Sequence, residues 1–442
     1  MNDLKVTVLG LGYVGLTTSL SFARAGISVQ GFEISKEKAD SIASGKVPFF
    51  EHGIPEILKT SLSDGTFIVS NSLSPGDINF ITVGTPSNED GSSDLSYIRS
   101  ASEMLGQSIG KFTKYSLIVV KSTVSPGTTE SVVKSLVEEH SKKKVGRDFG
   151  LAMNPEFLRE GSALQDIMEP DRLVIGEFDQ KSGDLLQQLY SKVYPSPKFP
   201  VLRTNIVNAE FIKYASNGYL AMKISFANSV ANVANTVPGA DVKTIVKGMG
   251  FDKRIGESFL GAGIGYGGSC FPKDTKALID FSKRQGIDPL ILSSVEDVNN
   301  RQPLKVVEFA EKALGSLHDK RIVLLGLSFK PKTDDIREAP SLKIIRKLLD
   351  SQVDSIIVYD PVASENVRRL FGDRISYSKS ALEAIRGADC AIVVTEWDEF
   401  KELTPKDFVS TMRTPLVIDG RRIYDPNVFS SALRFRAIGL GS

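Results

Sequence analysis

The first 180 residues alternate short apolar runs with stretches of helical length. The runs long enough to form strands stand at residues 5–10, 29–34, 78–86, 116–124, 150–157 and 172–177. This strand-helix-strand rhythm is typical of a mostly parallel sheet with helices on both faces. We therefore predict an α/β domain over this part of the chain.

The pattern changes in the middle of the chain and then returns. From about residue 206 to residue 248 the sequence is typical of long helix, with few helix-breaking residues before Pro238, and a second helical stretch covers 288–314. Because apolar residues occupy more than one face of the long helix, we expect it to mediate dimerisation as well. Strand-like runs resume at 321–329, 355–361, 390–397 and 415–423. The prediction is two doubly wound parallel-sheet domains joined by a central helical region, with boundaries at 1–203, 204–318 and 319–442.

Composition limits the classes of function. A chain of 442 residues with 41% hydrophobic residues can form two or three globular domains. Its 54 basic and 53 acidic residues nearly cancel, which argues against a nucleic-acid or membrane-surface partner. The N-terminus lacks a signal-peptide pattern, so we expect a cytoplasmic protein. The 2 cysteines and 3 histidines show no metal-ligand spacing, which leaves an organic cofactor or side chains alone to supply the chemistry.

A glycine-rich turn follows the first predicted strand. "VLGLGYVG" places Gly10, Gly12 and Gly15 between a strand and a helix, the context that the G-x-G-x-x-G pattern requires. Glu33 ends the next strand, where a carboxylate can accept from ribose hydroxyls and would repel a 2′-phosphate. The glycines alone would also fit a merely tight turn. Together with Glu33 they predict a Rossmann-like domain that binds NAD rather than NADP.

One of the two cysteines follows a second glycine-rich stretch, "GAGIGYGGSCFPKD" at 261–274. Pro272 can begin a helix, which would put Cys270 just ahead of the helix N-terminus. There the helix dipole and nearby Lys273 would favour the thiolate. Cys270 is thus either a nucleophile or inert filler, whereas Cys390 lies in an apolar strand and is expected to be inert.

The stretch "NPEFLREG" contains two glutamates four residues apart. Asn154 and Pro155 predict the start of a helix, which would place Glu156 and Glu160 on one helix face. Two carboxylates at the start of a helix can simply interact favourably with the helix dipole, or they can take part in catalysis.

The long central helix carries a second such pair. Lys213 and Asn217 in "EFIKYASN" lie four residues apart among apolar neighbours. A lysine there can extend its ammonium group to water, or an ammonium and an amide together can stabilise an oxyanion.

Several motifs, in order along nearly the whole chain, resemble the UDP-glucose 6-dehydrogenases of the UDP-glucose/GDP-mannose dehydrogenase family. They are "GLGYVG", "KSTV" before "PGTT" with one serine inserted, "NPEFLREGSALQD", "EFIKYASN", "GYGGSCFPKD" and "GLSFKPKTDDIREAPS". The resemblance implies two successive hydride transfers to NAD that convert the C6 alcohol of UDP-glucose into a carboxylate. It also implies that a cysteine thiolate captures the intermediate aldehyde as a thiohemiacetal, which is then oxidised to a thioester.

The resemblance assigns roles to the catalytic candidates. Cys270 would be the nucleophile, and Lys213 with Asn217 would stabilise the oxygen of the tetrahedral adducts. Asp274, with Thr123 and a bound water, would take the proton of the first oxidation. Glu156 would be the base for thioester hydrolysis.

The resemblance also implies the binding residues. For the cofactor these are Gly10, Gly12, Tyr13, Val14, Gly15, Glu33, Thr85, Thr123, Glu160, Lys273 and Arg337. For the nucleotide sugar they are Glu156, Phe157, Leu158, Glu160, Lys213, Asn217, Arg254, Gly267, Lys330 and Arg421. Lys330 and Arg421 would contact the phosphates or the uracil side, and Arg254 would reach the site of a neighbouring subunit. The expected assembly is therefore a homodimer or a larger homo-oligomer.

Other functions remain open from the sequence alone. Family members that oxidise UDP-N-acetylhexosamines commonly have a histidine before the cysteine and lack the Lys-Asp pair, so Ser269, Lys273 and Asp274 favour glucose. GDP-mannose oxidation is a weaker option. A hydroxyacid dehydrogenase of similar fold would make one NADH per substrate and leave Cys270 unexplained, and a non-catalytic nucleotide-binding regulator would make none.

Overall fold

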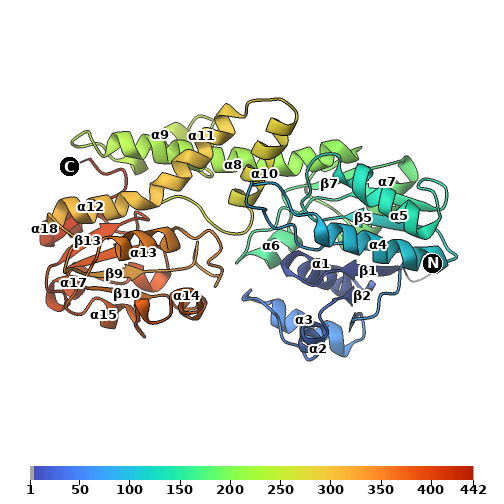
Figure 1. Cartoon of the computed structure of the whole chain (residues 1–442), viewed down its shortest axis with the longest axis horizontal. Helices are drawn as coiled ribbons and strands as arrows, with labels where there is room; N and C mark the ends of the chain where they lie inside the picture. Colours follow the sequence, from blue (N-terminus) through green and yellow to red (C-terminus); the bar gives the residue numbers. More distant parts are fainter. Residues whose placement is uncertain (1–3, 442) are drawn as a thin grey trace. The chain divides into compact units, whose positions relative to one another are not determined.

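The structure is a computed structural model that describes residues 4–441 of the chain. The chain forms two compact units, an N-terminal unit up to Ser216 and a C-terminal unit from Asn217. The division falls inside α8 (Ile206–Ala234), the long green helix of Figure 1. Within the described residues no helix has the length and hydrophobicity to cross a membrane.

The N-terminal unit is built on one sheet with strand order β3-β2-β1-β4-β5-β6-β7-β8. Neighbouring strands are parallel except for β6 and β7, which are antiparallel. The strands are β1 (Lys5–Leu9), β2 (Ser28–Phe32), β3 (Phe67–Ser70), β4 (Ile78–Ile81), β5 (Ser116–Val120), β6 (Phe149–Met153), β7 (Leu173–Glu177) and β8 (Val201–Asn205). The helices before α8 are α1 (Tyr13–Arg24), α2 (Lys36–Ala43), α3 (Ile54–Ser63), α4 (Ser96–Lys111), the π-helical η1 (Thr129–Lys134), α5 (Ser135–Ser141), α6 (Ala163–Met168) and α7 (Gln180–Val193).

Both faces of this sheet are buried, which explains its continuous apolar runs. In β5, Leu117 and Val119 pack in the core on one face, and Ile118 and Val120 pack in the core on the other. A strand that is buried on both faces shows no alternation of polar and apolar residues. Strand β2 pairs with one edge of β1, and β4 pairs with the other edge. The carboxyl ends of β1 and β4 therefore flank a topological switch point, where sheets of this kind bind ligands.

The C-terminal unit has a second sheet, of strand order β11-β10-β9-β12-β13-β14, in which all paired strands are parallel. Its strands are β9 (Arg321–Leu325), β10 (Ser355–Tyr359), β11 (Ser376–Tyr377), β12 (Cys390–Val393), β13 (Leu416–Asp419) and β14 (Arg434–Ala437). Its helices after α8 are α9 (Val242–Gly250), α10 (Phe271–Arg284), α11 (Leu290–Arg301), the 3-10 helix η2 (Gln302–Leu304), α12 (Lys305–Leu314), α13 (Pro340–Asp350), α14 (Ser364–Phe371), the 3-10 helix η3 (Gly372–Arg374), α15 (Ala381–Ala384), α16 (Asp398–Lys401), α17 (Pro405–Thr411) and α18 (Pro426–Ala432). The switch point of this sheet lies between β9 and β12.

The predicted fold class is confirmed, with two kinds of local difference. The edge strands β3, β8, β11 and β14 were not predicted, since each has at most 5 residues and includes exposed ones. Several predicted strands also end early. The apolar run at 78–86 leaves the sheet after Ile81, and its remaining residues form a loop at the carboxyl edge.

Candidate active site

The glycine turn after β1 has the geometry that its sequence predicts. Gly10 adopts φ +93°, which favours glycine. A Cβ atom on Gly15 would lie 1.8 Å from the Gly10 carbonyl oxygen, so the helix and the turn can pack this closely only without a side chain. Gly12 is the N-cap of α1, and a Cβ there would meet no atom within 4 Å. The open face of Gly12 at a helix N-terminus suits a pyrophosphate.

A cavity of about 280 Å³ opens beside this turn. Glu33 lies on its wall, buried, with Oε2 accepting from the Leu11 amide at 3.1 Å and lying 2.8 Å from Lys38 Nζ. This places a carboxylate at the end of β2, where a ribose would be bound. The residues present therefore fit NAD. The cavity is lined by Gly10, Gly12, Phe32, Glu33, Ile34, Lys38, Thr82, Val83, Gly84, Tyr97 and Met104, among others.

The loops after β4 and β5 are joined at the same edge of the sheet. The Thr85 hydroxyl donates to the Thr123 carbonyl oxygen at 2.8 Å, and the Ser122 hydroxyl donates to the Val83 carbonyl oxygen at 2.7 Å. The two threonines chosen from the sequence are thus in contact in the N-terminal unit.

The helix predicted to begin at Asn154 is wrong. Residues 154–159 form an extended loop, and α6 begins only at Ala163. Asn154 does not cap a helix, because its side chain is used in the interior: Oδ1 accepts from Lys121 Nζ at 2.7 Å, and Nδ2 donates to the Val174 carbonyl oxygen at 2.8 Å. Glu156 and Glu160 therefore do not share a helix face.

Glu156 instead forms a buried ion pair with Lys213 of α8. Glu156 Oε1 accepts from Lys213 Nζ at 2.8 Å, and Oε2 accepts from the Leu158 amide at 2.6 Å. Burial raises the pKa of Glu156, but the charge and hydrogen bond of Lys213 outweigh it and hold the pKa below its usual value. Lys213 is 3% exposed, so it does not extend to water. The Lys213 ammonium also lies 5.5 Å from the centre of the Phe157 ring.

A second buried lysine, Lys121, adds to this charge cluster. It lies directly after β5, and burial lowers its pKa to about 8. Its positive charge acts on Glu156 in the same direction as that of Lys213. Sequence reasoning missed Lys121, although a lysine that ends the apolar run "SLIVV" was a visible signal.

In the C-terminal unit, Cys270 is the N-cap of α10, and the helix begins at Phe271, one residue earlier than predicted. Cys270 is half-buried, and its sulfur lies 3.5 Å from the Ser269 hydroxyl. Cys390, in contrast, is buried in β12, and burial strongly raises the pKa of its thiol, which fits the predicted inert role.

The residues around α10 form one hydrogen-bonded group. The carboxylate of Asp274, in the first turn, accepts from Asn217 Nδ2 at 2.6 Å and lies 2.6 Å from Lys273 Nζ. Asp274 is 1% exposed, and Asn217 is also buried. The structure thus brings together three residues selected from the sequence, Asn217, Lys273 and Asp274, at the first turn of the helix that Cys270 caps.

The glycines before Cys270 allow the chain to pack closely on itself. A Cβ on Gly267 would lie 2.5 Å from the Glu338 carbonyl oxygen, and one on Gly268 would lie 2.8 Å from the Phe329 ring. Gly268 has φ +85°, and its amide donates to the Arg337 carbonyl oxygen at 2.8 Å. The two glycines are therefore required by the fold itself.

Arg421 stands at the switch point of the second sheet. Its guanidinium donates to three carbonyl oxygens: that of Val394 at 2.7 Å, that of Gly265 at 3.2 Å and that of Phe329 at 3.4 Å. Arg421 thereby ties the glycine stretch to the loops that follow β9 and β12.

A basic cavity of about 450 Å³ adjoins Arg421. Lys243 and Lys247 of α9 line it together with Arg422 and Gly261. Lys330 lies 5.4 Å from the centre of the Phe329 ring. Arg254 is exposed and pairs with Asp252 at 2.5 Å, and Arg337 is exposed and pairs with Asp335 at 2.7 Å.

Comparisons with known proteins agree with this geometry. Models of the UDP-glucose/GDP-mannose dehydrogenase family match as NAD binding domain at residues 4–194, as central domain at 207–301 and as UDP binding domain at 323–426. A UDP-glucose 6-dehydrogenase of Haloferax volcanii is 41% identical over 423 residues, which cover 95% of this chain and 97% of that protein. The chain belongs to the UDP-glucose/GDP-mannose dehydrogenase family. It is an NAD-dependent oxidoreductase.

Further relatives cover the chain almost completely. A UDP-glucose 6-dehydrogenase of Bacillus subtilis is 41% identical over 427 residues, covering 95% of this chain and 94% of that protein. The structure of a UDP-glucose dehydrogenase from Pyrobaculum islandicum aligns with a TM-score of 0.92 at 37% identity and covers 99% of this chain and 98% of that one. A UDP-D-ManNAc dehydrogenase structure from Pyrococcus horikoshii aligns with a TM-score of 0.87 at 29% identity, covering 99% of this chain and all of that one.

This dehydrogenase also contains a buried carboxylate that the sequence did not single out. Glu210 of α8 is fully buried and accepts from the Gly127 amide at 2.6 Å and from the Thr129 amide at 2.8 Å. It thereby fixes the loop between β5 and η1, which carries Thr123. Burial raises the pKa of Glu210 to about 7, and the nearby Glu130 acts in the same direction.

We predict that Glu210 makes the stability of the N-terminal unit depend on pH. Because its pKa is higher in the folded chain than in the unfolded chain, its contribution to stability should fall as the pH rises from about 4.5 to 7. Glu210→Gln stays uncharged, so its melting temperature should fall less than that of the wild type between pH 5 and pH 8, as measured by thermal unfolding. Glu139→Gln, at an exposed position of α5, serves as the control and should follow the wild type. Equal pH dependence in Glu210→Gln and wild type would contradict this assignment.

Proposed function

We propose that this dehydrogenase oxidises the C6 alcohol of UDP-glucose to the carboxylate of UDP-glucuronate, with two NAD and one water consumed per sugar. The observation that carries the proposal is the placement of Cys270 at the N-terminus of α10, whose first turn carries Lys273 and the Asp274 that binds Asn217. The names of relatives about 40% identical over nearly the whole chain support the choice of sugar.

Cys270 provides what a four-electron oxidation needs and a simple alcohol dehydrogenase lacks. The first oxidation removes a hydride from C6 and a proton from its hydroxyl, for which Asp274, with Thr123 and a water, is the proposed acceptor. The Cys270 thiolate then adds to the aldehyde carbon and forms a thiohemiacetal. Removal of the second hydride gives a thioester, and attack by water releases the carboxylate and the thiol. The glycine turn and Glu33 would hold NAD, which would supply the hydride acceptor for both oxidations.

The helix N-terminus gives Cys270 an electrostatic advantage. The partial positive charge of the amides at the start of α10 and the ammonium of Lys273 both favour the thiolate. Lys213 and Asn217 are proposed to stabilise the oxygen of the tetrahedral adducts, as an ammonium and an amide can.

Glu156 is proposed as the base that activates the hydrolytic water. Lys213 holds its pKa below the usual value, so the carboxylate is ionised at neutral pH and can accept a proton. Lys330 and Arg421 are proposed to bind the UDP group, together with the basic cavity beside Arg421. The planar guanidinium of an arginine can donate two hydrogen bonds to a phosphate, and the ammonium of a lysine adds a compact positive charge, so both suit a diphosphate.

We further propose that the active form is a homodimer or a larger homo-oligomer. In the C-terminal unit, Tyr219, Phe226 and Val233 of α8 are spaced by seven residues, and each is more than half exposed. Leu290 and Ile291 of α11 are also exposed. Apolar side chains repeated every two turns along one helix face are typical of a contact with a second helix. A second copy of this chain is the proposed occupant, and Arg254 is proposed to reach its active site.

We predict a stoichiometry of two NADH per UDP-glucose. With limiting UDP-glucose and excess NAD, absorbance at 340 nm should plateau at twice the sugar concentration, and the product should be UDP-glucuronate. One NADH per sugar would point to a simple alcohol dehydrogenase, and none would point to a binding protein. UDP-N-acetylglucosamine should react with a kcat/KM at least tenfold lower, and the reverse preference would assign the enzyme to the N-acetyl sugars.

We predict that Cys270→Ser abolishes acid formation. A serine hydroxyl is not ionised at neutral pH, so it cannot replace the thiolate as nucleophile, and release of UDP-glucuronate should fall by at least 100-fold. Cys390→Ala changes the other cysteine, which lies in the core, and should retain most of the activity. The measurement is the rate of UDP-glucuronate formation in each variant, quantified by chromatography. An undiminished rate in Cys270→Ser would rule out the covalent mechanism.

We predict that Phe226→Asp separates the subunits. A charge in the middle of the apolar face of α8 would have to be buried in the interface, which disfavours association. Size-exclusion chromatography with light scattering should show a lower mass for Phe226→Asp than for the wild type. Leu370→Asp is the control: it introduces the same charge at an exposed apolar residue of α14, away from the proposed interface, and should leave the mass unaltered. A wild-type protein that is monomeric would refute the proposed assembly.

A further inference from the structure

Glu51 is a buried carboxylate at which two separate segments of the N-terminal unit meet. Its Oε2 accepts from the Tyr13 hydroxyl at 2.6 Å and from the Gly161 amide at 2.6 Å, and its Oε1 accepts from the Ala163 amide at 3.0 Å. Tyr13 is the first residue of α1, directly after the glycine turn. Gly161 and Ala163 flank the start of α6.

The start of α6 requires an acceptor of this kind. The first amides of a helix have no partner within the helix, and the N-cap residue Ser162 provides no side-chain hydrogen bond. Glu51 takes this role: Oε1 accepts from the first amide of the helix, that of Ala163, and Oε2 accepts from the Gly161 amide just before the helix. Three donors satisfy the carboxyl group of Glu51, a residue that is only 4% exposed, and so reduce the cost of burying it.

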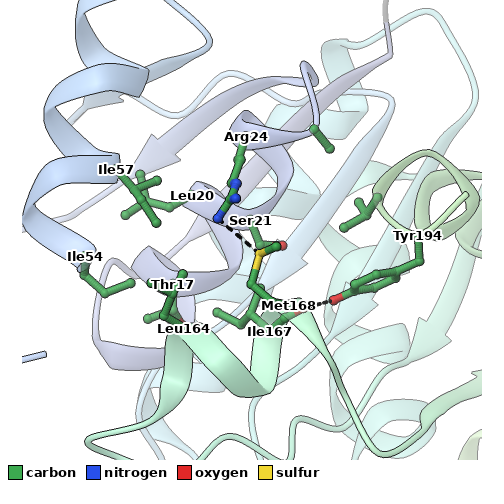
Figure 2. Close-up of a pocket in the computed structure, with 12 residues that line it drawn as sticks. Thr17, Leu20, Ser21, Arg24, Ile54, Ile57, Leu164, Ile167, Met168 and Tyr194 are labelled. Carbon is green, nitrogen blue, oxygen red and sulfur yellow. Dashed lines mark hydrogen bonds between the residues drawn. The ribbon is translucent and has the colours of Figure 1, made fainter. Parts of the chain in front are cut away.

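The apolar side of α6 packs on α1 and α3 around an open cavity. Figure 2 shows Leu164 and Ile167 of α6 facing Leu20 of α1 and Ile54 and Ile57 of α3. A cavity of about 160 Å³ remains among these side chains. Side chains that border a void lose part of their dispersion contacts. Besides this packing, α6 is held by Glu51 at its N-terminus, by the pair of Asp166 with Arg159, and by the Tyr194 hydroxyl, which donates to the Ile167 carbonyl oxygen at 2.6 Å.

The same anchor controls the position of Glu160. Glu160 precedes Gly161, whose amide is bound to Glu51, and the Tyr13 hydroxyl also lies 3.4 Å from the Arg159 carbonyl oxygen. Burial, the hydrogen bond to Glu51 and the charge of Glu160 all raise the pKa of Tyr13, so the phenol stays protonated and remains a donor to Glu51. Residues 159–163 are thus tied to the helix that follows the cofactor turn.

We infer that Glu51 is a positioning residue for the sugar side of the active site: it holds residues 159–163, including Glu160, in register with the glycine turn. The inference rests on the proposed function, because it names UDP-glucose as the ligand that these residues help to bind. Glu156 is anchored separately by Lys213, so Glu51 acts on binding of the sugar more than on the chemical steps.

Glu51→Gln tests the inference, since a glutamine has one acceptor oxygen where the glutamate has two. The NH₂ group of the glutamine would face an amide donor, and the start of α6 would lose part of its anchor. We expect the KM for UDP-glucose to rise at least tenfold. Because Tyr13 and Glu160 are also proposed cofactor contacts, the KM for NAD should rise as well, but by a smaller factor. Hydrogen-deuterium exchange should become faster in a peptide that covers residues 158–168 and stay unchanged in one that covers β1.

Tyr13→Phe provides a second, milder variant that removes one of the three donors. Its KM for UDP-glucose should rise two- to fourfold, and the substitution should have little further effect in the Glu51→Gln background, because the two residues act through one contact. Glu56→Gln, at an exposed position in the first turn of α3, is the control and should match the wild type in all constants.

Two results would overturn the inference. One is a KM for UDP-glucose within twofold of the wild type in both variants. The other is a parallel rise of both KM values with a loss of kcat, which would mean general destabilisation. If the wild-type enzyme does not oxidise UDP-glucose, the proposed function fails, but the exchange experiment still decides whether Glu51 anchors residues 159–163. Should Glu51→Gln fail to fold, Tyr13→Phe alone carries the test.

Discussion

The reversal of strand order beside β1 is the constraint on which the cofactor half of the site depends. Because β2 and β4 pair with opposite edges of β1, the connections that follow β1 and β4 diverge, and backbone groups at their carboxyl ends are left open to a ligand. Gly10, Gly12 and Thr82 border the cavity at this point. The second sheet repeats the arrangement between β9 and β12, and there Arg421 binds the carbonyl oxygens of both following loops.

Charges buried near these openings behave differently according to their partners. Glu156 and Glu210 both lie in the interior and both accept backbone amides. Glu156 also faces Lys213 and Lys121, and its pKa is lowered, whereas Glu210 has no such cation among the groups that shift it, and its pKa is raised to about 7. At these two sites the direction of the pKa shift follows the presence of a buried cation rather than the presence of amide donors. The first environment keeps a carboxylate ionised at neutral pH, the state in which it can accept a proton.

The sequence predicted those features that depend on local pattern. Strands buried on both faces, such as β5, appear as apolar runs, and Gly10, Gly12, Gly15 and Pro272 indicate turns and helix starts through their own backbone preferences. The segment after Asn154 was predicted wrongly because Asn154 is a good helix cap in isolation, while in the fold its amide binds Lys121 and Val174. Glu51 and Glu210 were missed because each forms hydrogen bonds with residues more than 30 positions away. The spacing of neighbouring residues in the sequence does not indicate such a contact.

Helix α8 carries buried polar residues among many apolar ones. Glu210, Lys213 and Asn217 are spaced by three and four residues and so lie along one stripe of the helix, and all three are buried. Each binds a different segment: Glu210 the loop before η1, Lys213 the loop after β6, and Asn217 the first turn of α10. A lysine and a glutamate in the interior would destabilise a helix that served packing alone, because alanine or leucine would fill the same space without a desolvation cost. Lys213 and Asn217 each have a fixed partner that is a residue of the proposed reaction, Glu156 and Asp274 respectively, whereas Glu210 holds backbone amides.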